Sequence, residues 1–257
     1  MDKLNYPTGP LARAFAIVRY VASQRKSLSV AEISAALDLP IPTAHRLIAN
    51  LESMGYLQRA VGSKRVMVGS ALLELGADSI ASAFSMSSVY GLLQKVSANI
   101  GEQCEICIVR HATVEFIASV KSESFMGLQF DAGKQGPLHC TSTGKIYLST
   151  LKDSALQRIV ASLPLRRFTP NTITEPEQLL DEIKVVRERG WAATNEEYVL
   201  GVVGCGVPIP AGPGGIIACL GISVPSARVP FKRLASFIPQ MQHAARELSG
   251  QVLFTDG

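Results

Sequence analysis

Several residue types that mark particular protein classes are scarce in this sequence. Its 257 residues include one tryptophan, four histidines and five cysteines. An odd number of cysteines at irregular spacing does not resemble a disulfide framework, and scattered histidines give little support for a metal-dependent enzyme. The sequence has no uncharged apolar run of about twenty residues and no N-terminal signal-peptide pattern. We therefore expect a reduced, cytoplasmic protein that contacts no membrane and binds no cofactor.

The charge is distributed unevenly along the chain. Residues 1–69 carry nine Lys and Arg against four acids, a net charge of +5, whereas the remainder has a net charge of −1. An excess of basic residues in one segment is what attraction to phosphate requires. The excess is moderate, so we expect several copies of the chain to bind DNA together.

Two short helices joined by a tight turn are predicted between residues 29 and 57. Ser29 and Glu32 have the spacing of a capping box, and Asp38-Leu39-Pro40 ends the first helix. Apolar residues at helical spacing form the inward stripe of a second helix, which ends at Gly55. A helix-turn-helix of this kind can place short polar side chains in a DNA major groove. The residues expected to contact bases or phosphates are Thr43, His45, Arg46 and Asn50.

A short basic ribbon is predicted directly after this motif. Residues 56–59 and 66–68 have strand character, and a basic turn, Gly62-Ser63-Lys64-Arg65, joins them. Such a ribbon is a wing, and we expect Lys64 and Arg65 to contact the DNA backbone. A helix over Leu11–Ser23, with Phe15, Val18 and Val21 on one side, completes the core. The alternative, an ordinary helical hairpin, does not explain the ribbon.

The rest of the chain mixes helices and strand pairs and predicts an α+β sensor-like domain. Two β-rich runs around Arg110-His111-Ala112-Thr113 form one predicted hairpin, and residues 202–210 and 216–224 form another. Residues 126–135 are a further candidate strand. Predicted helices cover residues 69–83, 89–100, 142–151, 154–161, 176–189 and 229–248. The expected domains are a winged helix-turn-helix (1–69), a linker helix (70–86) and an effector-binding domain (87–257).

Four stretches resemble the isocitrate lyase regulator (IclR) family of bacterial transcription factors. They are LPIPTAHRLIANLESMGYLQR, VGSALLELG, GPLHCTSTGKIYLS and GWAATNEEYVLGVVGCGVPI, the last followed by LGIS. The resemblance implies an N-terminal winged helix-turn-helix and a C-terminal effector domain related to GAF folds. It also implies a homodimer or homotetramer that controls an operon for degrading small organic or aromatic acids, as a repressor or an activator.

The chain departs from the family pattern at positions that affect both expected sites. Ile41 and Pro42 stand where a Lys and a Ser are usual, so two contacts to DNA are missing. Thr194 and Asn195 replace acids, and Gly221 replaces the first Ser of a Ser-Ile-Ser motif. We therefore expect a less acidic, less polar pocket and a larger effector, such as an aromatic acid.

A carboxylate site is predicted at the start of the helix that begins near residue 142. Free N–H groups and the positive end of the helix dipole favour an anion there. The alternative is that Ser142 only caps its helix. The residues expected at the effector site are Met126, Leu128, His139, Cys140, Ser142, Thr143, Asn195, Glu197, Gly204, Cys205 and Ser223.

Other motifs are better explained without catalysis. Cys104 and Cys107 form a C-x-x-C, but alternate strand residues face opposite ways and no second pair is present. Cys140 beside His139 could form a nucleophilic pair, although adjacent residues rarely face each other. Thr143-Gly144-Lys145 lacks the spacing of a phosphate loop. An enzyme with an accessory helical domain, and a sensor whose helix-turn-helix contacts protein, are the competing hypotheses.

Overall fold

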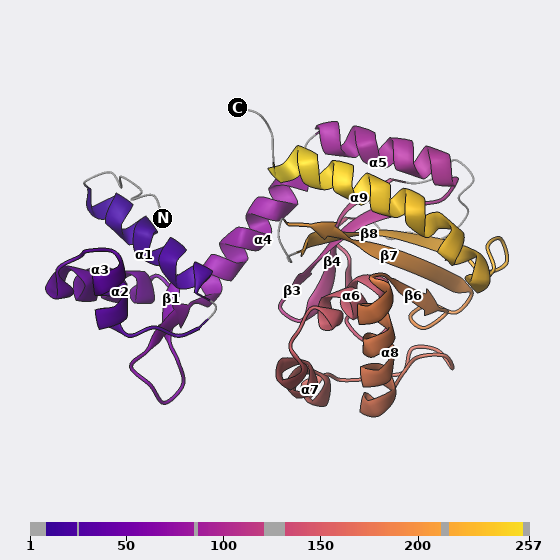
Figure 1. Cartoon of the computed structure of the whole chain (residues 1–257). Coiled ribbons are helices and arrows are strands. Elements are labelled where there is room, and N and C mark those ends of the chain that lie inside the picture. Colours follow the sequence, from indigo (N-terminus) through magenta and orange to yellow (C-terminus); the bar gives the residue numbers. More distant parts are fainter. Residues whose placement is uncertain (1–8, 25, 85–86, 121–131, 212–215, 254–257) are drawn as a thin grey trace. The chain divides into compact units, whose positions relative to one another are not determined.

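The computed structural model describes residues 9–24, 26–84, 87–120, 132–211 and 216–253. The chain divides into two compact units, Met1–Ser79 and Ile80–Gly257, and the division falls within one helix, α4 (Ser70–Phe84). Both units are drawn in Figure 1, and each has its own hydrophobic core. Among the helices of the described residues, none combines the length and apolarity that a membrane crossing requires.

The first unit consists of helices followed by a small antiparallel sheet (Figure 1). Its elements are α1 (Pro10–Ser23), α2 (Val30–Ala36), α3 (Ile41–Ser53), β1 (Leu57–Arg59) and β2 (Val66–Val68). This order confirms the predicted helix-turn-helix and the basic ribbon after it.

Helix α2 begins at the predicted capping box. Ser29 Oγ accepts a hydrogen bond from the Glu32 N–H at 3.2 Å, and the Glu32 carboxylate accepts one from the Ser29 N–H at 2.6 Å. Helix α3 has Pro42 in its first turn, where a missing N–H leaves no hydrogen bond unmade. Its buried stripe consists of Ala44, Leu47, Ile48 and Leu51.

Helix α1 buries two of the three residues predicted to face the core, Val18 and Val21, but not Phe15. Ile17, Val18 and Val21 are buried, whereas the Phe15 side chain is 59% exposed. Ile17 lies two residues after Phe15, which is about 200° around the helix. The prediction that Phe15 joins the core is therefore wrong.

The β1–β2 hairpin is attached to the segment that precedes α2. Leu28 and Val66 exchange backbone hydrogen bonds of 2.8 and 2.6 Å and form an isolated β-bridge. Both side chains are buried in the core of the unit. The hairpin is thus held at one end, and its loop of residues 60–65 extends beyond the paired strands.

The second unit is built around an antiparallel sheet with the order β5-β4-β3-β8-β7-β6. The two predicted hairpins, β3–β4 and β7–β8, are confirmed, and pairing of β3 with β8 joins them into one sheet. The strands are β3 (Cys104–Arg110), β4 (Thr113–Val120), β5 (Gln135–Pro137), β6 (Ala192–Asn195), β7 (Val202–Pro210) and β8 (Ile216–Pro225).

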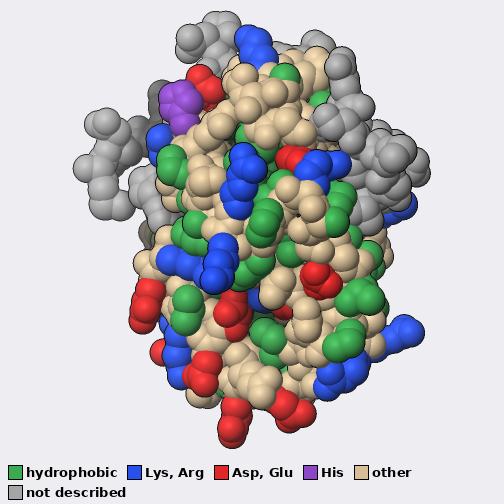
Figure 2. Space-filling view, turned by 90° about the vertical axis from the view of Figure 1, so that its right-hand side faces the viewer, with side chains coloured by type: hydrophobic (Ala, Val, Ile, Leu, Met, Phe, Trp, Pro, Cys, Tyr) green, Lys and Arg blue, Asp and Glu red, His purple; other side chains and the backbone are tan. Residues whose placement is uncertain are grey.

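Helices cover both faces of this sheet (Figure 1). Helices α5 (Ser87–Ile100) and α9 (Ile238–Leu253) lie on one face, and α6 (Ser142–Ser149) and α8 (Pro176–Arg189) lie on the other. Helix α7 (Asp153–Ser162) packs beside α8. On the outer face of the unit that Figure 2 shows, basic and acidic side chains are interspersed among hydrophobic ones.

The structure differs from the sequence prediction at three segments. Strand β6 was not predicted, because four residues are too few to show alternation. The last helix is not continuous from residue 229: a 3₁₀ helix, Phe231–Phe237, precedes α9, and Pro239 lies in the first turn of α9. Of the candidate strand 126–135, only Gln135 is seen as strand, in β5, and residues 126–131 lie outside the described residues.

Removing the α2 cap tests the predicted role of Ser29. We expect Ser29→Ala to lower the free energy of unfolding by about 1 kcal/mol, since the Glu32 N–H loses the hydroxyl oxygen to which it donates, while the Ser29 N–H remains. Urea unfolding of the full chain measures the change. Ser53→Ala is the control, because Ser53 is exposed and bonds only to the Asn50 carbonyl within α3. Equal loss in the two variants would contradict the prediction.

Candidate effector cavity and DNA-binding surface

Three neighbouring strands form the floor of a small cavity in the second unit. In the register of the sheet, Glu105 of β3 lies beside Gly221 of β8, and Gly221 lies beside Gly206 of β7. A Cβ atom added at Gly221 would lie 3.2 Å from Glu105 Oε1, and one at Gly206 would lie 2.9 Å from Ser142 Oγ. The two glycines therefore provide the space over the sheet in which Glu105 and Ser142 lie.

Helix α6 starts at this floor, and Thr141 is its cap. Thr141 Oγ1 accepts a hydrogen bond from the Gly144 N–H at 3.2 Å and donates one to the Pro137 carbonyl at 2.7 Å. Because Thr141 fills this role, Ser142 does not cap the helix. The N–H groups of Ser142 and Thr143, in the first turn, have no acceptor within the helix. Both residues line the cavity.

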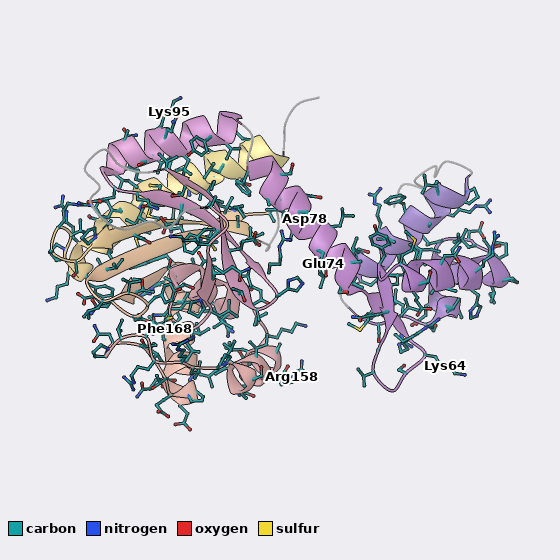
Figure 3. All side chains as sticks on the ribbon, turned by 180° about the vertical axis from the view of Figure 1, so that it is seen from behind. Lys64, Glu74, Asp78, Lys95, Arg158 and Phe168 are labelled. Carbon is teal, nitrogen blue, oxygen red and sulfur yellow. The ribbon has the colours of Figure 1, made fainter. Side chains whose placement is uncertain are left out.

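The cavity is small and of mixed character. Its volume is about 40 Å³, whereas an engineered cavity that holds benzene has a volume of about 150 Å³. The ring of Tyr198 lines one side, and Phe168, labelled in Figure 3, packs against it edge to face with 5.0 Å between ring centroids. The polar lining consists of Glu105, Thr141, Ser142, Thr143, Thr194 and Ser223.

Glu105 brings a buried carboxyl group into the cavity. Its side chain is buried, and Oε1 accepts a hydrogen bond from Ser223 Oγ at 2.6 Å. Oε2 has no hydrogen-bond partner among the described residues. Burial raises the pKa of Glu105 to about 7, although the Ser223 hydrogen bond opposes the rise. The expectation of a less acidic pocket, which rested on Thr194, Asn195 and Gly221, did not include this carboxyl group.

A buried ion pair anchors α6 behind the cavity. Lys145 Nζ lies 2.7 Å from Glu197 Oε1, 3.1 Å from the Ala193 carbonyl oxygen and 3.3 Å from Glu182 Oε1. Burial raises the pKa of Glu197, and the Lys145 ammonium opposes that rise. Lys145 therefore fixes the helix to the turn after β6 and is not directed at a phosphate.

Five of the predicted effector residues line the cavity. They are Cys140, Ser142, Thr143, Gly204 and Ser223. They come from the loop before α6, the first turn of α6, and strands β7 and β8. Of the other six predicted residues, four do not line the cavity, and Met126 and Leu128 lie outside the described residues.

Four predicted residues are not part of the lining. Cys205 lies on the opposite face of the sheet, where its sulfur is 3.8 Å from the Met241 sulfur, because successive strand residues point to opposite faces. Asn195 is exposed, and Glu197 pairs with Lys145. His139 is buried, with Nε2 3.0 Å from the Arg166 carbonyl oxygen. These four side chains are therefore not among the lining residues of this cavity.

Glu105, Thr194 and Tyr198 line the cavity but were not predicted as site residues. Glu105 had a recognisable signal, since it is the one charged residue within the apolar run CEICIV. A charge in the middle of an otherwise apolar strand is rarely buried without a role. Thr194 and Tyr198 lie in β6 and the turn after it, a region in which no strand was predicted.

The groups around the cavity do not form a nucleophilic centre. Burial raises the pKa of the Cys140 thiol to about 12, and the His139 ring is turned to the Arg166 carbonyl. Cys104 and Cys107 are both buried and free, and Cys107 alone of the two lines the cavity. Within the described residues, no cluster of His, Cys, Asp and Glu could hold a metal ion.

The candidate DNA-binding surface lies on α3 and the loop between β1 and β2. His45, Arg46 and Asn50 of α3 are exposed, and Thr43 is half-buried. Lys64 is exposed in the loop (Figure 3). Arg65 differs: its guanidinium donates to the Ser27 carbonyl at 2.9 Å and to Glu32 at 2.7 Å. It therefore holds the hairpin to the start of α2.

The chain combines a winged helix-turn-helix with a second unit that contains a small cavity. This combination is typical of one-component regulators, which bind DNA and sense a ligand with the same chain. A family model described as "IclR helix-turn-helix domain" matches residues 10–60, and one described as "Bacterial transcriptional regulator IclR C-terminal" matches residues 84–250. The chain belongs to the IclR family of bacterial transcriptional regulators. It is a DNA-binding regulator with an effector domain, and not an enzyme.

Characterised relatives and solved structures resemble the chain over nearly its whole length. "Probable transcriptional regulator SauR" of Cupriavidus necator is 30% identical, with 95% of this chain and 97% of the relative covered. "HTH-type transcriptional repressor AllR" of Escherichia coli is 27% identical, with 93% and 88% covered. The Thermotoga maritima IclR crystal structure has a TM-score of 0.61 and 25% identity, with 95% and 98% covered.

An IclR homolog from Microbacterium hydrocarbonoxydans has been solved in complex with 4-hydroxybenzoate. It has a TM-score of 0.58 and 22% identity, with 95% of this chain and 99% of that chain covered. At this identity the likeness concerns the fold alone.

The raised pKa of Glu105 predicts a pH-dependent stability. Between an ordinary pKa of 4.5 and about 7, the folded protein binds a proton that the unfolded chain releases, so stability falls as pH rises through this window. We expect Glu105→Gln to be more stable than the wild type at pH 8, by roughly 3 kcal/mol, and the difference to vanish near pH 4. Urea unfolding at several pH values measures it.

Glu196→Gln is the control for that experiment. The Gly201 N–H and the Ser226 hydroxyl lower the pKa of Glu196, so its contribution to stability has the opposite sign. This contribution is present above the ordinary pKa and is lost as pH falls. A Glu105→Gln variant that loses stability at pH 8, as the control does, would contradict the assignment.

Proposed function

We propose that this regulator binds a small organic carboxylic acid in the cavity at the start of α6, and that this binding adjusts its affinity for the operator of a catabolic operon. The observation that carries the proposal is the first turn of α6. Its free N–H groups, at Ser142 and Thr143, belong to residues that line a small cavity. Helix N-termini favour anions through both these donors and the helix dipole.

The carboxyl group of Glu105 is compatible with an acidic ligand. Its pKa of about 7 leaves a substantial protonated fraction at neutral pH, so an anion entering the cavity does not always meet a second negative charge. Ser223, whose hydroxyl donates to Glu105, lines the cavity with it. An organic anion with one carboxylate therefore suits the site better than one with several.

The size of the cavity favours an aliphatic acid over an aromatic one. A volume of about 40 Å³ is roughly a quarter of that which holds benzene, so a benzene ring needs displacement of the lining side chains. The aromatic acid remains the alternative, and a relative of the same fold has been solved with 4-hydroxybenzoate. A comparison of small aliphatic and aromatic acids in a thermal-shift titration decides between them.

For DNA binding, we propose that α3 enters the major groove and that the β1–β2 loop follows the phosphate backbone. Thr43, His45, Arg46 and Asn50 are the contacts to bases or phosphates, and Lys64 contacts the backbone. We propose a homodimer or homotetramer that presents two α3 helices to a palindromic site in the cytoplasm. The moderate charge of the first unit supports the need for more than one copy.

Arg46→Ala tests the assignment of α3. We expect operator affinity to fall about tenfold or more, since an arginine contact to a base is worth about 1–3 kcal/mol. The measurement is a mobility-shift titration on a site selected by the wild-type protein from random DNA, at two salt concentrations.

Arg158→Ala removes an exposed arginine from α7, in the other unit, and is the matched control (Figure 3). If Arg46→Ala binds the operator as tightly as the wild type, α3 is not the recognition helix. If binding to the DNA site does not weaken with added salt, contact with phosphates is not its source, and the hypothesis that the helix-turn-helix contacts another protein is favoured.

The double variant Ser142→Ala and Ser223→Ala tests the cavity. We expect operator affinity without effector to stay within twofold of the wild type, and the effector concentration for half response to rise about tenfold. The double variant Ser162→Ala and Ser236→Ala, which removes two exposed hydroxyls bonded within their own helices, is the control. The cavity variant keeps the N–H groups of the first turn of α6, so a full response would show that neither hydroxyl contacts the effector.

A further inference from the structure

One buried carboxylate oxygen of a cavity-lining residue has no hydrogen-bond partner among the described residues. Glu105 is 4% exposed, and its Oε2 has no hydrogen-bond partner among the described residues, although Oε1 is bonded to Ser223. A buried polar atom without a partner costs free energy, and glutamine or leucine would fill the same space at lower cost. Because the atom belongs to a residue that lines the cavity, a ligand can provide the missing partner.

The register of the sheet sets the distance that such a ligand must span. Glu105 lies over Gly221, and Ser142 lies over Gly206, and these two glycines are directly opposite each other on β8 and β7. Positions directly opposite on neighbouring strands are about 5 Å apart. Because each end of the ligand also needs room for a hydrogen bond to the protein, the two polar groups of the ligand must lie closer together than this, as do a carboxylate and a substituent on the next carbon or the one after it.

We propose that Glu105 determines effector specificity by accepting, through Oε2, a hydrogen bond from a hydroxyl or ammonium group on an acid whose carboxylate binds the first turn of α6. The inference rests on the proposed function and narrows it from organic acids in general to hydroxy or amino acids. When Glu105 is ionised, an acid with a keto group in that position presents an acceptor to an acceptor and is disfavoured, whereas the protonated carboxyl group can donate to a keto oxygen.

Glu105 is also the group in the cavity that titrates near neutral pH. Burial raises the pKa of every thiol near it, and that of Tyr198. The titratable groups around it are the thiols of Cys104, Cys107, Cys140 and Cys205 and the phenol of Tyr198. Lys145 of α6 is paired with Glu197 and Glu182 and does not neutralise Glu105.

Four acids with the same three-carbon skeleton test the proposal by isothermal titration calorimetry on the full chain. Lactate carries a hydroxyl, alanine an ammonium group, pyruvate a keto oxygen, and propionate none of these. At pH 8, where Glu105 is mostly ionised, we expect lactate or alanine to bind the wild type at least tenfold more tightly than propionate and pyruvate. Preference for alanine, increasing from pH 6 to pH 8 as Glu105 ionises, identifies the ammonium group, and preference for lactate identifies the hydroxyl.

Glu105→Gln keeps an acceptor for Ser223 and replaces Oε2 with a donor. We expect it to lose the preference for lactate or alanine, to bind pyruvate more tightly, and to lose the pH dependence. Gly221→Ala is a second variant, since its Cβ would lie 3.2 Å from Glu105 Oε1 and would displace the carboxyl group without removing it. Glu115→Gln, which changes a carboxylate paired with Arg110 on β3–β4, is the matched control.

The outcomes separate this inference from the proposed function. Propionate binding as tightly as lactate and alanine, or an unchanged preference in Glu105→Gln, overturns the role of Glu105 and leaves the acid site standing. Failure of all four acids to bind overturns the effector class and the inference together.

Discussion

The close approach of helix α6 to the loop that joins it to β5 is the constraint on which the second unit depends. Gly144 has no room for a side chain, because a Cβ atom there would lie 2.1 Å from the Leu138 carbonyl oxygen. Lys145, the next residue, is 1% exposed and bonds to Glu197 and to the Ala193 carbonyl. A buried ammonium group is tolerated only with such partners. The same turn of helix thus anchors itself and presents its first N–H groups to the cavity.

In the first unit, two arginine side chains form ion pairs within the protein. Arg59 pairs with Glu52, and Arg65 pairs with Glu32, so these guanidinium groups stabilise the hairpin against the helices. The net charge of residues 1–69 already counts both glutamates and is unchanged by these pairs, but two of the nine basic side chains are held within the protein. Arg46 and Lys64 are exposed and take part in no ion pair among the described residues.

Local periodicity predicted most of the helices and both main hairpins, whereas the site depended on pairings that are distant in the sequence. Glu105 and its partner Ser223 are 118 residues apart, and only the pairing of β3 with β8 brings them together. Alternation along β7 assigns Gly204 and Cys205 to opposite faces, but the strand sequence does not state which of the two faces lines the cavity. Strand β6 is too short to carry a periodic signal.

The five cysteines are all buried and unpaired by disulfides. Alkylating reagents and peroxides attack the thiolate, so the folded second unit, which contains every cysteine of the chain, protects these sulfurs in two ways: by excluding the reagent and by keeping the thiol protonated. The rate at which they become modified is then set by how often the unit opens. The rate of cysteine modification in the unlabelled protein therefore reports how often the second unit opens.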